Sequence, residues 1–321
     1  MDGVLIIDKP AGWTSHDVVA RVRRLLGEQR VGHTGTLDPF ATGVLVVLLG
    51  RATRIARFLA GAEKEYEALI RLGYATDTGD VTGRPRVIAA GIGERKRQGD
   101  GATWSDEQIE SAIGSLRGEI DQVPPMFSAK KVKGRKLYEM ARRGEEIERA
   151  PVRVSVREFG VVPRDDATLL RQNDDGTCDL LTRVVCSAGT YVRVLAESVG
   201  ERLGTGAHLA ALRRTRAGAF RIGDALGIES LEEMCKAGTL TKIILSPDAA
   251  LSNMPFVHLT GDEARRVRHG APVPVREAVP EWKGGEGVRM HDEQGILVAI
   301  GIYLVESGQI HPRVLMVAEE K

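Results

Sequence analysis

The sequence lacks the long apolar segments that mark membrane proteins. In 321 residues the longest uninterrupted apolar run is GVLVVLLG (43–50), whereas a membrane-spanning helix needs roughly 20 such residues. The N-terminal stretch MDGVLIIDKP also lacks the basic segment and the cleavage site of a signal peptide. These absences predict a cytoplasmic protein that has no membrane partner.

Cysteine is also scarce. Only Cys178, Cys186 and Cys235 are present, and none of them forms a C-x-x-C pair. This number and spacing exclude a disulfide framework and disfavour a zinc site. We therefore expect all three side chains to be buried as small apolar groups.

A large excess of one charge is missing too, because the formal net charge is only +1. The charges are nevertheless unevenly distributed. Residues 128–157 contain ten Lys or Arg and four acids, and residues 202–221 contain five Arg and no acid. Two basic zones in a nearly neutral chain are typical of a phosphate-binding face, although either zone alone fits a solvated surface equally well.

Hydrophobic periodicity predicts helices and strands that mix without regular βαβ alternation, which favours the α+β class. Strands are expected at 4–10, 43–49, 64–73, 152–162 and 178–187. Helices are expected at 15–27 with Ser15 as N-cap, at 51–62, at 105–118 with a Ser105–Gln108 capping box, at 134–144, and at 191–203 with Thr190 as cap. Residues 89–102 and 163–176 read as loops, and the tail after about 250 reads as one helix (257–270) followed by three short strands.

A glycine-rich stretch, GHTGTLDPFATGVL (32–45), leads directly into a predicted buried strand. A phosphate loop is disfavoured, because the stretch has neither a Walker lysine nor a G-x-G-x-x-G pattern. A nucleotidyltransferase loop with paired histidines is disfavoured, because His33 stands alone. Two interpretations remain: a rigid loop that presents the carboxylate of Asp38, which Pro39 keeps out of the α region, and a plain Asp-Pro turn.

This stretch resembles the signature of the TruB family, the tRNA pseudouridine-55 synthases. Four further blocks resemble the same family in the same order. They are VLIIDKPAGWTSHDVV (4–19), KEYEALIRLGYATDTGD (64–80), VPPMFSAKKVKGRKLYEMARRG (123–144) and CSAGTYVRVLAESVGERLGTGAHLAALRRT (186–215). The tail resembles a PUA-type RNA-binding module more weakly.

The resemblance implies an α+β protein with two domains. A pseudouridine-synthase-like catalytic domain with a mixed β-sheet and flanking helices would occupy residues 1–252, with a basic thumb loop at about 122–152. A small β-rich, PUA-like module would occupy 255–318. The implied partner is the T arm of tRNA. No obligate protein partner is implied, so a monomer is expected.

The implied reaction converts uridine at position 55 of the T loop to pseudouridine. The base is detached from C1′ at N1, rotated and rejoined at C5, so no cofactor and no metal are expected. Asp38 would be the nucleophile on a flipped-out base. The resemblance leaves open whether Asp38 attacks the base, attacks C1′ or assists a glycal route, and it leaves the general base unassigned.

The family pattern implies roles for further residues. Arg193 would pair with Asp38, and Leu212 would line the pocket. Tyr66 would stack on the uracil, and its phenol is one candidate for the base that removes the proton from C5. His33 would fill the place of the extruded base. The basic side chains of the thumb would clamp RNA phosphates, and they are Lys130, Lys131, Lys133, Arg142 and Arg143.

Two of these assignments compete with simpler interpretations. Tyr66, Ala68 and Ile70 occupy alternate positions and so share one face of the predicted strand, which is equally typical of a tyrosine in the core. Tyr191, also implied as a substrate-binding residue, shares a site with Arg193 only if the chain is extended before the helix begins. A tRNA-binding chaperone that flips the T arm without catalysis also remains possible for the whole chain, and it would not need Asp38.

Overall fold

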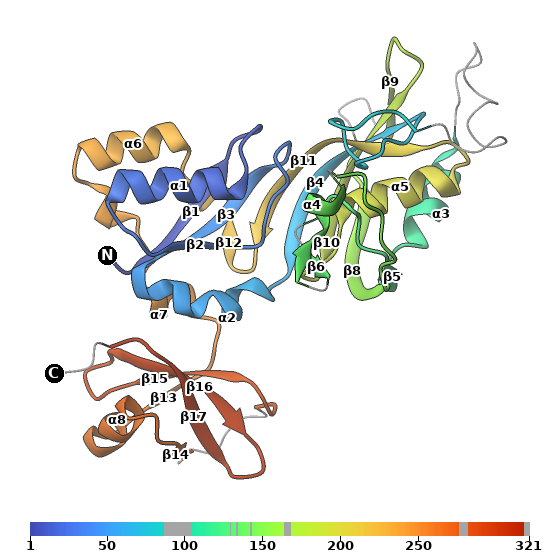
Figure 1. Cartoon of the computed structure of the whole chain (residues 1–321). Helices are drawn as coiled ribbons and strands as arrows, with labels where there is room; N and C mark the ends of the chain where they lie inside the picture. The colour runs from blue at the N-terminus through green and yellow to red at the C-terminus, as the bar shows by residue number, and fades with distance from the viewer. Residues whose placement is uncertain are drawn as a thin grey trace.

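The computed structural model describes residues 1–86, 104–128, 130–132, 134–141, 143–163, 168–275 and 282–317. The loop predicted at 89–102 lies outside these ranges. Figure 1 shows a broad upper body built on one long sheet and a smaller module below it. The described residues therefore have the mixed α+β architecture that the sequence predicts.

The large sheet has the strand order β1-β3-β11-β4-β10-β8-β5, with β2, β9 and β12 pairing at its sides. Its strands are β1 (Gly3–Lys9), β2 (Val31–Thr34), β3 (Thr42–Leu49), β4 (Lys64–Leu72), β5 (Gly118–Gln122), β8 (Val152–Val161), β9 (Leu170–Gln172), β10 (Cys178–Cys186), β11 (Ala207–Ala217) and β12 (Phe220–Arg221). All five predicted strands are present. β2, β5, β11 and β12 were not predicted, and β9 lies inside the segment expected to be a loop.

β1 and β3 are apolar at consecutive positions because both of their faces are covered. Val4 and Ile6 pack on one face, in a cluster that includes Ile55. Leu5 and Ile7 pack on the opposite face against helix α1 (Ser15–Leu26). A continuous apolar run is the pattern expected of a strand that is buried on both sides.

β4, β10 and β11 are the long central strands of the sheet, and β4 and β11 extend from one half of the upper body to the other (Figure 1). In β4 the side chains of Tyr66, Ala68 and Ile70 are buried, as their alternation predicts. They share a core with helices α3 (Asp106–Gly114) and α5 (Val192–Arg202). This core supports the inner wall of the cavity described below.

Two of the predicted helix caps are wrong, and one is confirmed. The N-cap of α1 is Thr14, whose hydroxyl accepts from the Asp17 amide at 3.1 Å, while Ser15 is the first helical residue. Thr190 does not cap α5, because Tyr191 occupies the N-cap position without a side-chain hydrogen bond. The Ser105–Gln108 capping box of α3 is present.

The remaining helices are short. They are η1 (Gly50–Ile55), α2 (Ala56–Ala60), α4 (Leu137–Ala141), η2 (Ile222–Asp224), α6 (Ile228–Lys236), η3 (Leu240–Lys242), α7 (Pro247–Ala250) and α8 (Gly261–Arg268). The single helix predicted at 51–62 is thus a 3₁₀ turn followed by α2. Among the described residues, no helix is long and apolar enough to cross a membrane.

The C-terminal module contains a five-stranded sheet in the order β13-β15-β16-β17-β14. Its strands are β13 (Phe256–His258), β14 (Val273–Pro274), β15 (Gly287–His291), β16 (Leu297–Leu304) and β17 (Gln309–Leu315). The helix predicted at 257–270 is therefore wrong at its start, where β13 pairs with β15. The other three predicted strands are β15, β16 and β17.

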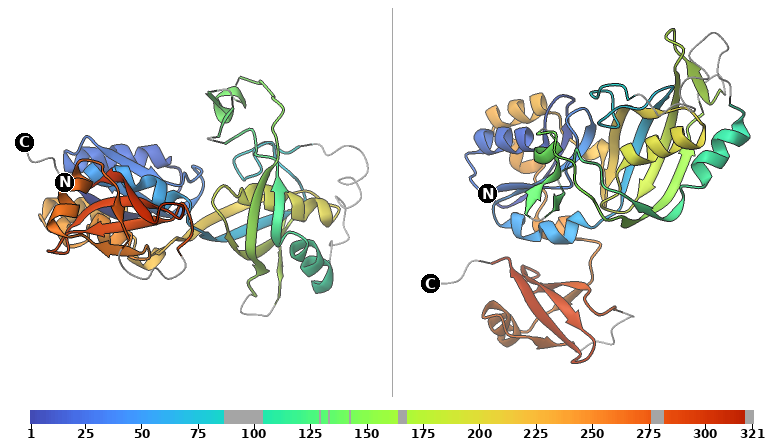
Figure 2. Two further views of the ribbon diagram at one scale, coloured as in Figure 1. Left: turned by 90° about the horizontal axis from the view of Figure 1, so that it is seen from below. Right: turned by 45° about the vertical axis from the view of Figure 1, so that its right-hand side comes forward.

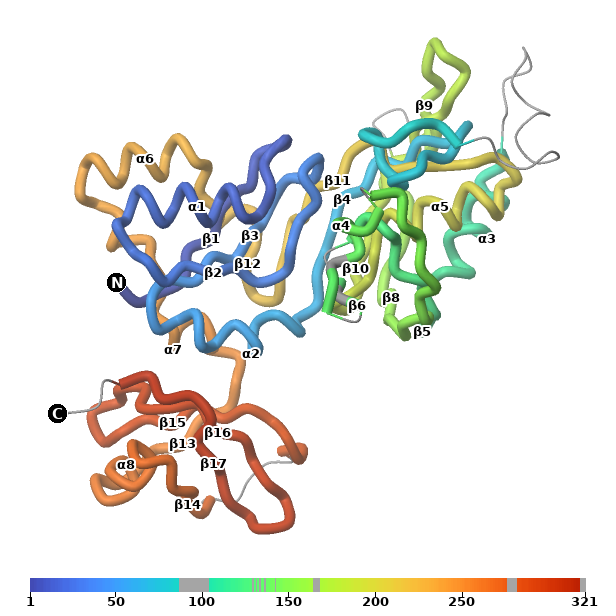
Figure 3. Tube along the Cα trace, in the orientation of Figure 1, coloured from blue at the N-terminus to red at the C-terminus, as the bar shows by residue number. Residues whose placement is uncertain are grey.

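The module is joined to the upper body by a single passage of chain after α7, which the tube in Figure 3 shows plainly. The two parts also touch. Ile300 and Val314 of the module belong to the same apolar cluster as Ile55, and Arg54 donates to the carbonyl of Leu315 at 3.1 Å. The residue at which one domain ends and the next begins stays a prediction.

The basic segment predicted to be a thumb contains a small two-stranded sheet and a short helix. β6 (Lys131–Val132) pairs with β7 (Arg135–Lys136), and α4 follows directly. In the left view of Figure 2 this segment stands away from the large sheet. It therefore forms a projection beside the sheet rather than a part of its core.

The cysteines only partly follow the prediction. Cys178 and Cys186 are buried in the core of the large sheet, but Cys235 on α6 is partly exposed. The prediction for Cys235 was wrong because α6 covers the sheet with one face only, and Cys235 lies at the edge of that contact.

Candidate active site

Asp38 lies in the loop between β2 and β3, and several contacts fix the backbone of this loop. The amide of Leu37 donates to the hydroxyl of Ser15 at 2.9 Å, and that hydroxyl donates back to the Leu37 carbonyl at 3.3 Å. One residue beyond Asp38, the carbonyl of Pro39 accepts from the Gly12 amide at 2.8 Å and from the buried Lys9 ammonium at 3.2 Å. The N-terminal segment thus clamps the chain on both sides of the carboxylate.

Arg214 on β11 fixes the rest of the glycine-rich loop. Its side chain is 1% exposed and donates to the carbonyls of Gly35 and Val44, at 2.8 and 2.7 Å. A Cβ at Gly43 would meet the main chain of Arg214 at 2.2 Å, so only glycine allows this close approach. The glycines therefore let the loop lie directly against β11.

Arg193 in the first turn of α5 holds the carboxylate of Asp38 with two nitrogens. The Nε of Arg193 lies 2.9 Å from Oδ2 of Asp38, and Nη2 lies 3.2 Å from Oδ1. The other hydrogen bonds of the guanidinium go to the carbonyls of Thr78 and Phe127. Because Arg193 is only 4% exposed, this planar group can hold the carboxylate in one orientation.

Burial and the neighbouring charges have opposing effects on the pKa of Asp38. Burial raises the pKa of the Asp38 carboxyl above its ordinary value of 3.8, Arg193 lowers it, and the negative charge of Asp80 raises it again. The side chain of Asp38 is still 33% exposed to the adjacent cavity. Its carboxylate is thus accessible and ion-paired at the same time.

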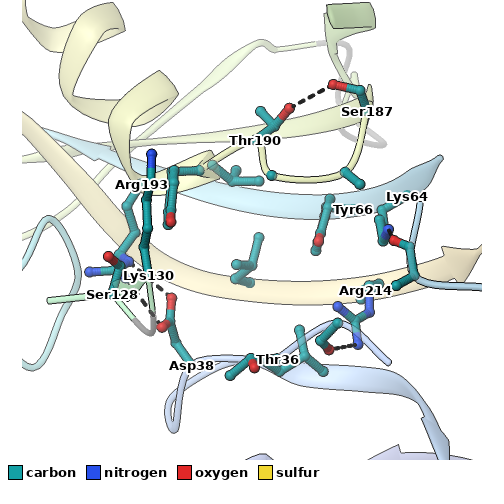
Figure 4. Close-up of a pocket in the computed structure, with 18 residues that line it drawn as sticks. Thr36, Asp38, Lys64, Tyr66, Ser128, Lys130, Ser187, Thr190, Arg193 and Arg214 are labelled. Atoms are coloured by element: carbon teal, nitrogen blue, oxygen red, sulfur yellow. Dashed lines mark hydrogen bonds and ion pairs between the residues drawn. The ribbon is translucent and has the colours of Figure 1, made fainter. Parts of the chain in front are cut away.

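A cavity of about 290 Å³ opens beside this ion pair (Figure 4). Besides Asp38, five of the residues that the family pattern singled out line it: Tyr66, Lys130, Tyr191, Arg193 and Leu212. Tyr191 reaches the cavity because its backbone is extended, with φ −101° and ψ 105°, just before α5 begins. The condition for Tyr191 and Arg193 to share a site is therefore met.

Tyr66 lies on the opposite wall of the cavity from Asp38 (Figure 4). Burial raises the pKa of its phenol above 10.0, so the group stays protonated at neutral pH. A protonated phenol is a poor proton acceptor, which favours a stacking role over the role of base. Nearby Lys64 donates to the carbonyls of Ala60 and Ala62, and burial lowers its pKa to about 8.

His33 lies on β2 and does not line the cavity. Burial, together with the charges of His16 and Arg214, lowers its pKa to about 4, so its ring is neutral at physiological pH. Its ring centroid is 5.5 Å from that of His16, and its buried Nδ1 has no hydrogen-bond partner among the described residues. The structure therefore does not bring His33 into the cavity with the other site residues.

The predicted phosphate contacts of the thumb are only partly described. Lys130 lines the cavity, and Arg143 is exposed after α4. Lys131 is a residue of β6, while Lys133 and Arg142 lie outside the described residues. Of these five residues, the structure thus places one beside the cavity.

The second basic zone does not form a phosphate-binding face as a unit. Arg214 is buried, Arg213 pairs with Asp8 at 2.7 Å, and Arg216 pairs with Glu63 at 2.7 Å. The count of charges was misleading, because β11 lies in the middle of the sheet, where neighbouring strands supply carbonyls and carboxylates to its arginines.

Several residues of the site were not identified from the sequence. The carboxylate of Asp80 lies 4.0 Å from the guanidinium of Arg193. Lys64 and Arg214 line the cavity. Ser128 lies next to the ion pair of Asp38 and Arg193. Lys64 and Asp80 begin and end the block KEYEALIRLGYATDTGD, which was the available signal for both. Ser128 and Arg214 likewise lie in the blocks 123–144 and 186–215, but local spacing does not distinguish them from surface residues. Among the described residues, no group of three or more His, Cys, Asp or Glu could hold a metal ion.

Two family models match adjoining parts of the chain. The model described as TruB family pseudouridylate synthase (N terminal domain) matches residues 23–192. The model described as tRNA pseudouridylate synthase B C-terminal domain matches residues 193–252. The ion pair described above thus joins a residue of the first match to a residue of the second.

Individual relatives are similar over most of the chain. A tRNA pseudouridine synthase B of Geobacillus thermodenitrificans is 45% identical over 284 residues, which are 88% of this chain and 89% of the relative. One of Ralstonia nicotianae is 40% identical over 319 residues, 98% and 94% of the two chains. Among solved structures, an H/ACA ribonucleoprotein bound to a substrate RNA containing 2′-deoxyuridine aligns with a TM-score of 0.71 and 26% identity, covering 99% of this chain and 86% of the other.

Proposed function

The chain belongs to the TruB family of pseudouridylate synthases and converts uridine in tRNA to pseudouridine, and we propose that its target is position 55 in the T loop. We further propose that Asp38 is the nucleophile and that no cofactor takes part. The observation that carries this proposal is the two-nitrogen ion pair between Asp38 and the buried Arg193 at the wall of the cavity.

The proposed reaction rearranges bonds without any net gain or loss of atoms. The bond between C1′ and N1 breaks, a bond between C1′ and C5 forms, the proton on C5 leaves and N1 gains a proton. Asp38 assists by bonding transiently to C1′ or to the base, or by removing a proton from C2′. Each of these routes requires its carboxylate beside the glycosidic bond, which Arg193 favours by holding it at the cavity wall.

The other cavity residues bind the extruded base. Tyr66 stacks on the uracil, and Leu212 and Tyr191 line the space around it. A base within a folded T loop must leave its stack before any of these contacts form. We propose that His33, which lies outside the cavity, contacts the RNA where the base has left rather than the base itself.

The remainder of the RNA contacts surfaces outside the cavity. Lys130, Lys131, Lys133, Arg142 and Arg143 bind phosphates from the thumb, and the C-terminal module acts as a PUA-like RNA-binding domain. Proteins recognise folded RNA largely through its shape and its phosphates, so a projecting basic segment suits this task. We propose that the protein is cytoplasmic and monomeric. Light scattering of the free protein and of its RNA complex would test the monomeric state.

The experiment that tests this function is tritium release from a T-arm RNA labelled at uridine C5. The wild type, Asp38→Asn and Asp38→Ala are compared without added nucleotide or metal. We expect release by the wild type alone, with both variants still binding the RNA. Release by Asp38→Asn at the wild-type rate would remove Asp38 from the chemistry.

The same experiment separates the enzyme from the two alternatives. A chaperone would bind the T arm without releasing tritium from any uridine. A nucleotidyltransferase would act only when a nucleotide is added. Labelling a single uridine at a time in the T arm identifies the target position, and release from any position other than 55 would contradict that part of the proposal.

A further inference from the structure

Ser128 has a buried hydroxyl that no other described residue binds. The residue is 5% exposed, and its Oγ has no hydrogen-bond partner among the residues that the structure describes. Buried hydroxyl groups in proteins almost always have a partner, because leaving one unpaired is unfavourable. The hydroxyl of Ser128 is therefore a candidate for binding a group of the substrate.

The main chain around Ser128 is held firmly in place. The carbonyl of Ser128 accepts from the Tyr138 amide at 3.0 Å, and the carbonyl of Phe127 accepts from Arg193 at 2.7 Å. The second contact ties Ser128 to the guanidinium that also holds Asp38. Ser128 is thus positioned by the same residue as the nucleophile.

Ser128 also lies at the end of the cavity where Asp38 is found. Figure 4 shows Ser128 beside Arg193 and Asp38, whereas Tyr66 and Lys64 lie toward the other end. If the uracil stacks on Tyr66, the sugar of the same nucleotide must lie nearer to the carboxylate. Ser128 therefore lies at the end of the cavity that the sugar of the bound nucleotide would occupy.

We propose that Ser128 binds the ribose 2′-hydroxyl of the target uridine, an inference that rests on the proposed function. Asp38 must lie beside the glycosidic bond, and C2′ is the carbon next to C1′. The 2′-hydroxyl is both donor and acceptor, so it matches the serine hydroxyl. A phosphate is a less suitable partner for Ser128, because Lys130, which also lines the cavity, offers it an ammonium group instead.

The test is a binding cycle with two RNAs that differ in one atom. T-arm stem-loops carry uridine or 2′-deoxyuridine at the target position, and dissociation constants are measured with Asp38→Asn so that no RNA is converted. We expect uridine RNA to bind about 3- to 10-fold more tightly, which is the range of one neutral hydrogen bond. In Asp38→Asn/Ser128→Ala the two RNAs should bind equally.

Ser187→Ala in the same background is the matched control. Ser187 also lines the cavity, but its hydroxyl already accepts from the Ser155 amide at 2.9 Å. This control should keep the preference for uridine RNA, which shows that loss of any cavity serine is not sufficient. Thermal unfolding of each variant establishes that it is folded.

Two results would overturn the inference. One is equal binding of both RNAs by Asp38→Asn, and the other is a preference that survives in the double variant. Tritium release by the otherwise unchanged protein tests the proposed function separately. Failure of the binding cycle with normal release would therefore remove Ser128 alone.

Discussion

The side chain of Ser15 and the main chain of Leu37 exchange two hydrogen bonds, in which the Leu37 amide donates at 2.9 Å and the Ser15 hydroxyl donates at 3.3 Å. Both groups are buried, and the next residue in the chain is Asp38. Helix α1 is thus coupled directly to the backbone of the proposed nucleophile.

Ser15→Ala should lower kcat by about tenfold or more while leaving KM nearly unchanged. The substitution leaves the buried amide of Leu37 without its partner, which costs about 1–3 kcal/mol and loosens the peptide before Asp38. Steady-state kinetics on T-arm RNA measure the effect. Thr14→Ala is the control, because it removes the N-cap of the same helix, costing about 1 kcal/mol of stability, without touching the loop. Equal loss of kcat in both variants would assign Ser15 a purely structural role.

Arg193→Lys should lower kcat by about 100-fold even though the positive charge is kept. A lysine ammonium cannot reproduce the planar contacts to both oxygens of Asp38 and to two carbonyls, and a small misplacement of a reacting group has an effect of this size. Single-turnover rates at saturating RNA measure the chemical step. An unchanged rate would show that charge alone is required.

The acid side of the pH–rate profile should report Asp38. Burial and the charge of Asp80 raise the pKa of Asp38 above 3.8, although Arg193 lowers it in part. As the pH is lowered, kcat/KM should therefore begin to fall while the pH is still above 3.8. Asp80→Asn removes a raising contribution, so its acid limb should shift to lower pH. The position of the limb, rather than the maximal rate, is the measured quantity. A shift to higher pH would contradict this account of the site.

His33 should make the folded state sensitive to mild acid. Its pKa is about 4 in the folded protein and 6.5 is its ordinary value, so only the unfolded chain binds this proton between those values. The stability contributed by neutral His33 is therefore present above about 6.5 and is lost as pH falls toward 4. Urea unfolding at about pH 5 and about pH 7 should show a smaller difference in His33→Gln than in the wild type. The exposed His258→Gln is the control and should behave as the wild type does.

Charge reversal of Lys130, Lys131 and Lys133 should weaken RNA binding and reduce its dependence on salt. Each lost phosphate contact lowers the slope of log K against log salt concentration by roughly 0.7–0.9. Binding is measured over a series of salt concentrations. A control with the same change in net charge reverses the exposed Arg24, Lys236 and Lys242 on the distant helices α1 and α6 and the turn η3. Equal slopes in the two variants would remove the three lysines from the interface.

The sequence by itself determined those parts of the local structure that depend on neighbouring residues, and it made Asp38 a candidate nucleophile. The alternation in β4, the apolar run of β3 and the capping box of α3 depend only on neighbours in the chain, and the structure contains all three. For Asp38 the local pattern left two interpretations open, a presented carboxylate and a plain Asp-Pro turn, and only the family resemblance implied a nucleophile. The five motifs that occur in the order of the TruB family also predicted the family, which the comparisons confirm.

Only the tertiary structure decided which polar side chains remain available to a substrate. Arg214 looked like part of a basic surface, yet β11 buries it between strands. Ser128 looked like an ordinary loop residue, yet its hydroxyl is buried and has no partner among the described residues. His33 belongs to the same glycine-rich stretch as Asp38, yet it lies outside the cavity. Burial and pairing depend on contacts between segments far apart in the chain, such as Arg214 with Gly35, and no local spacing encodes them.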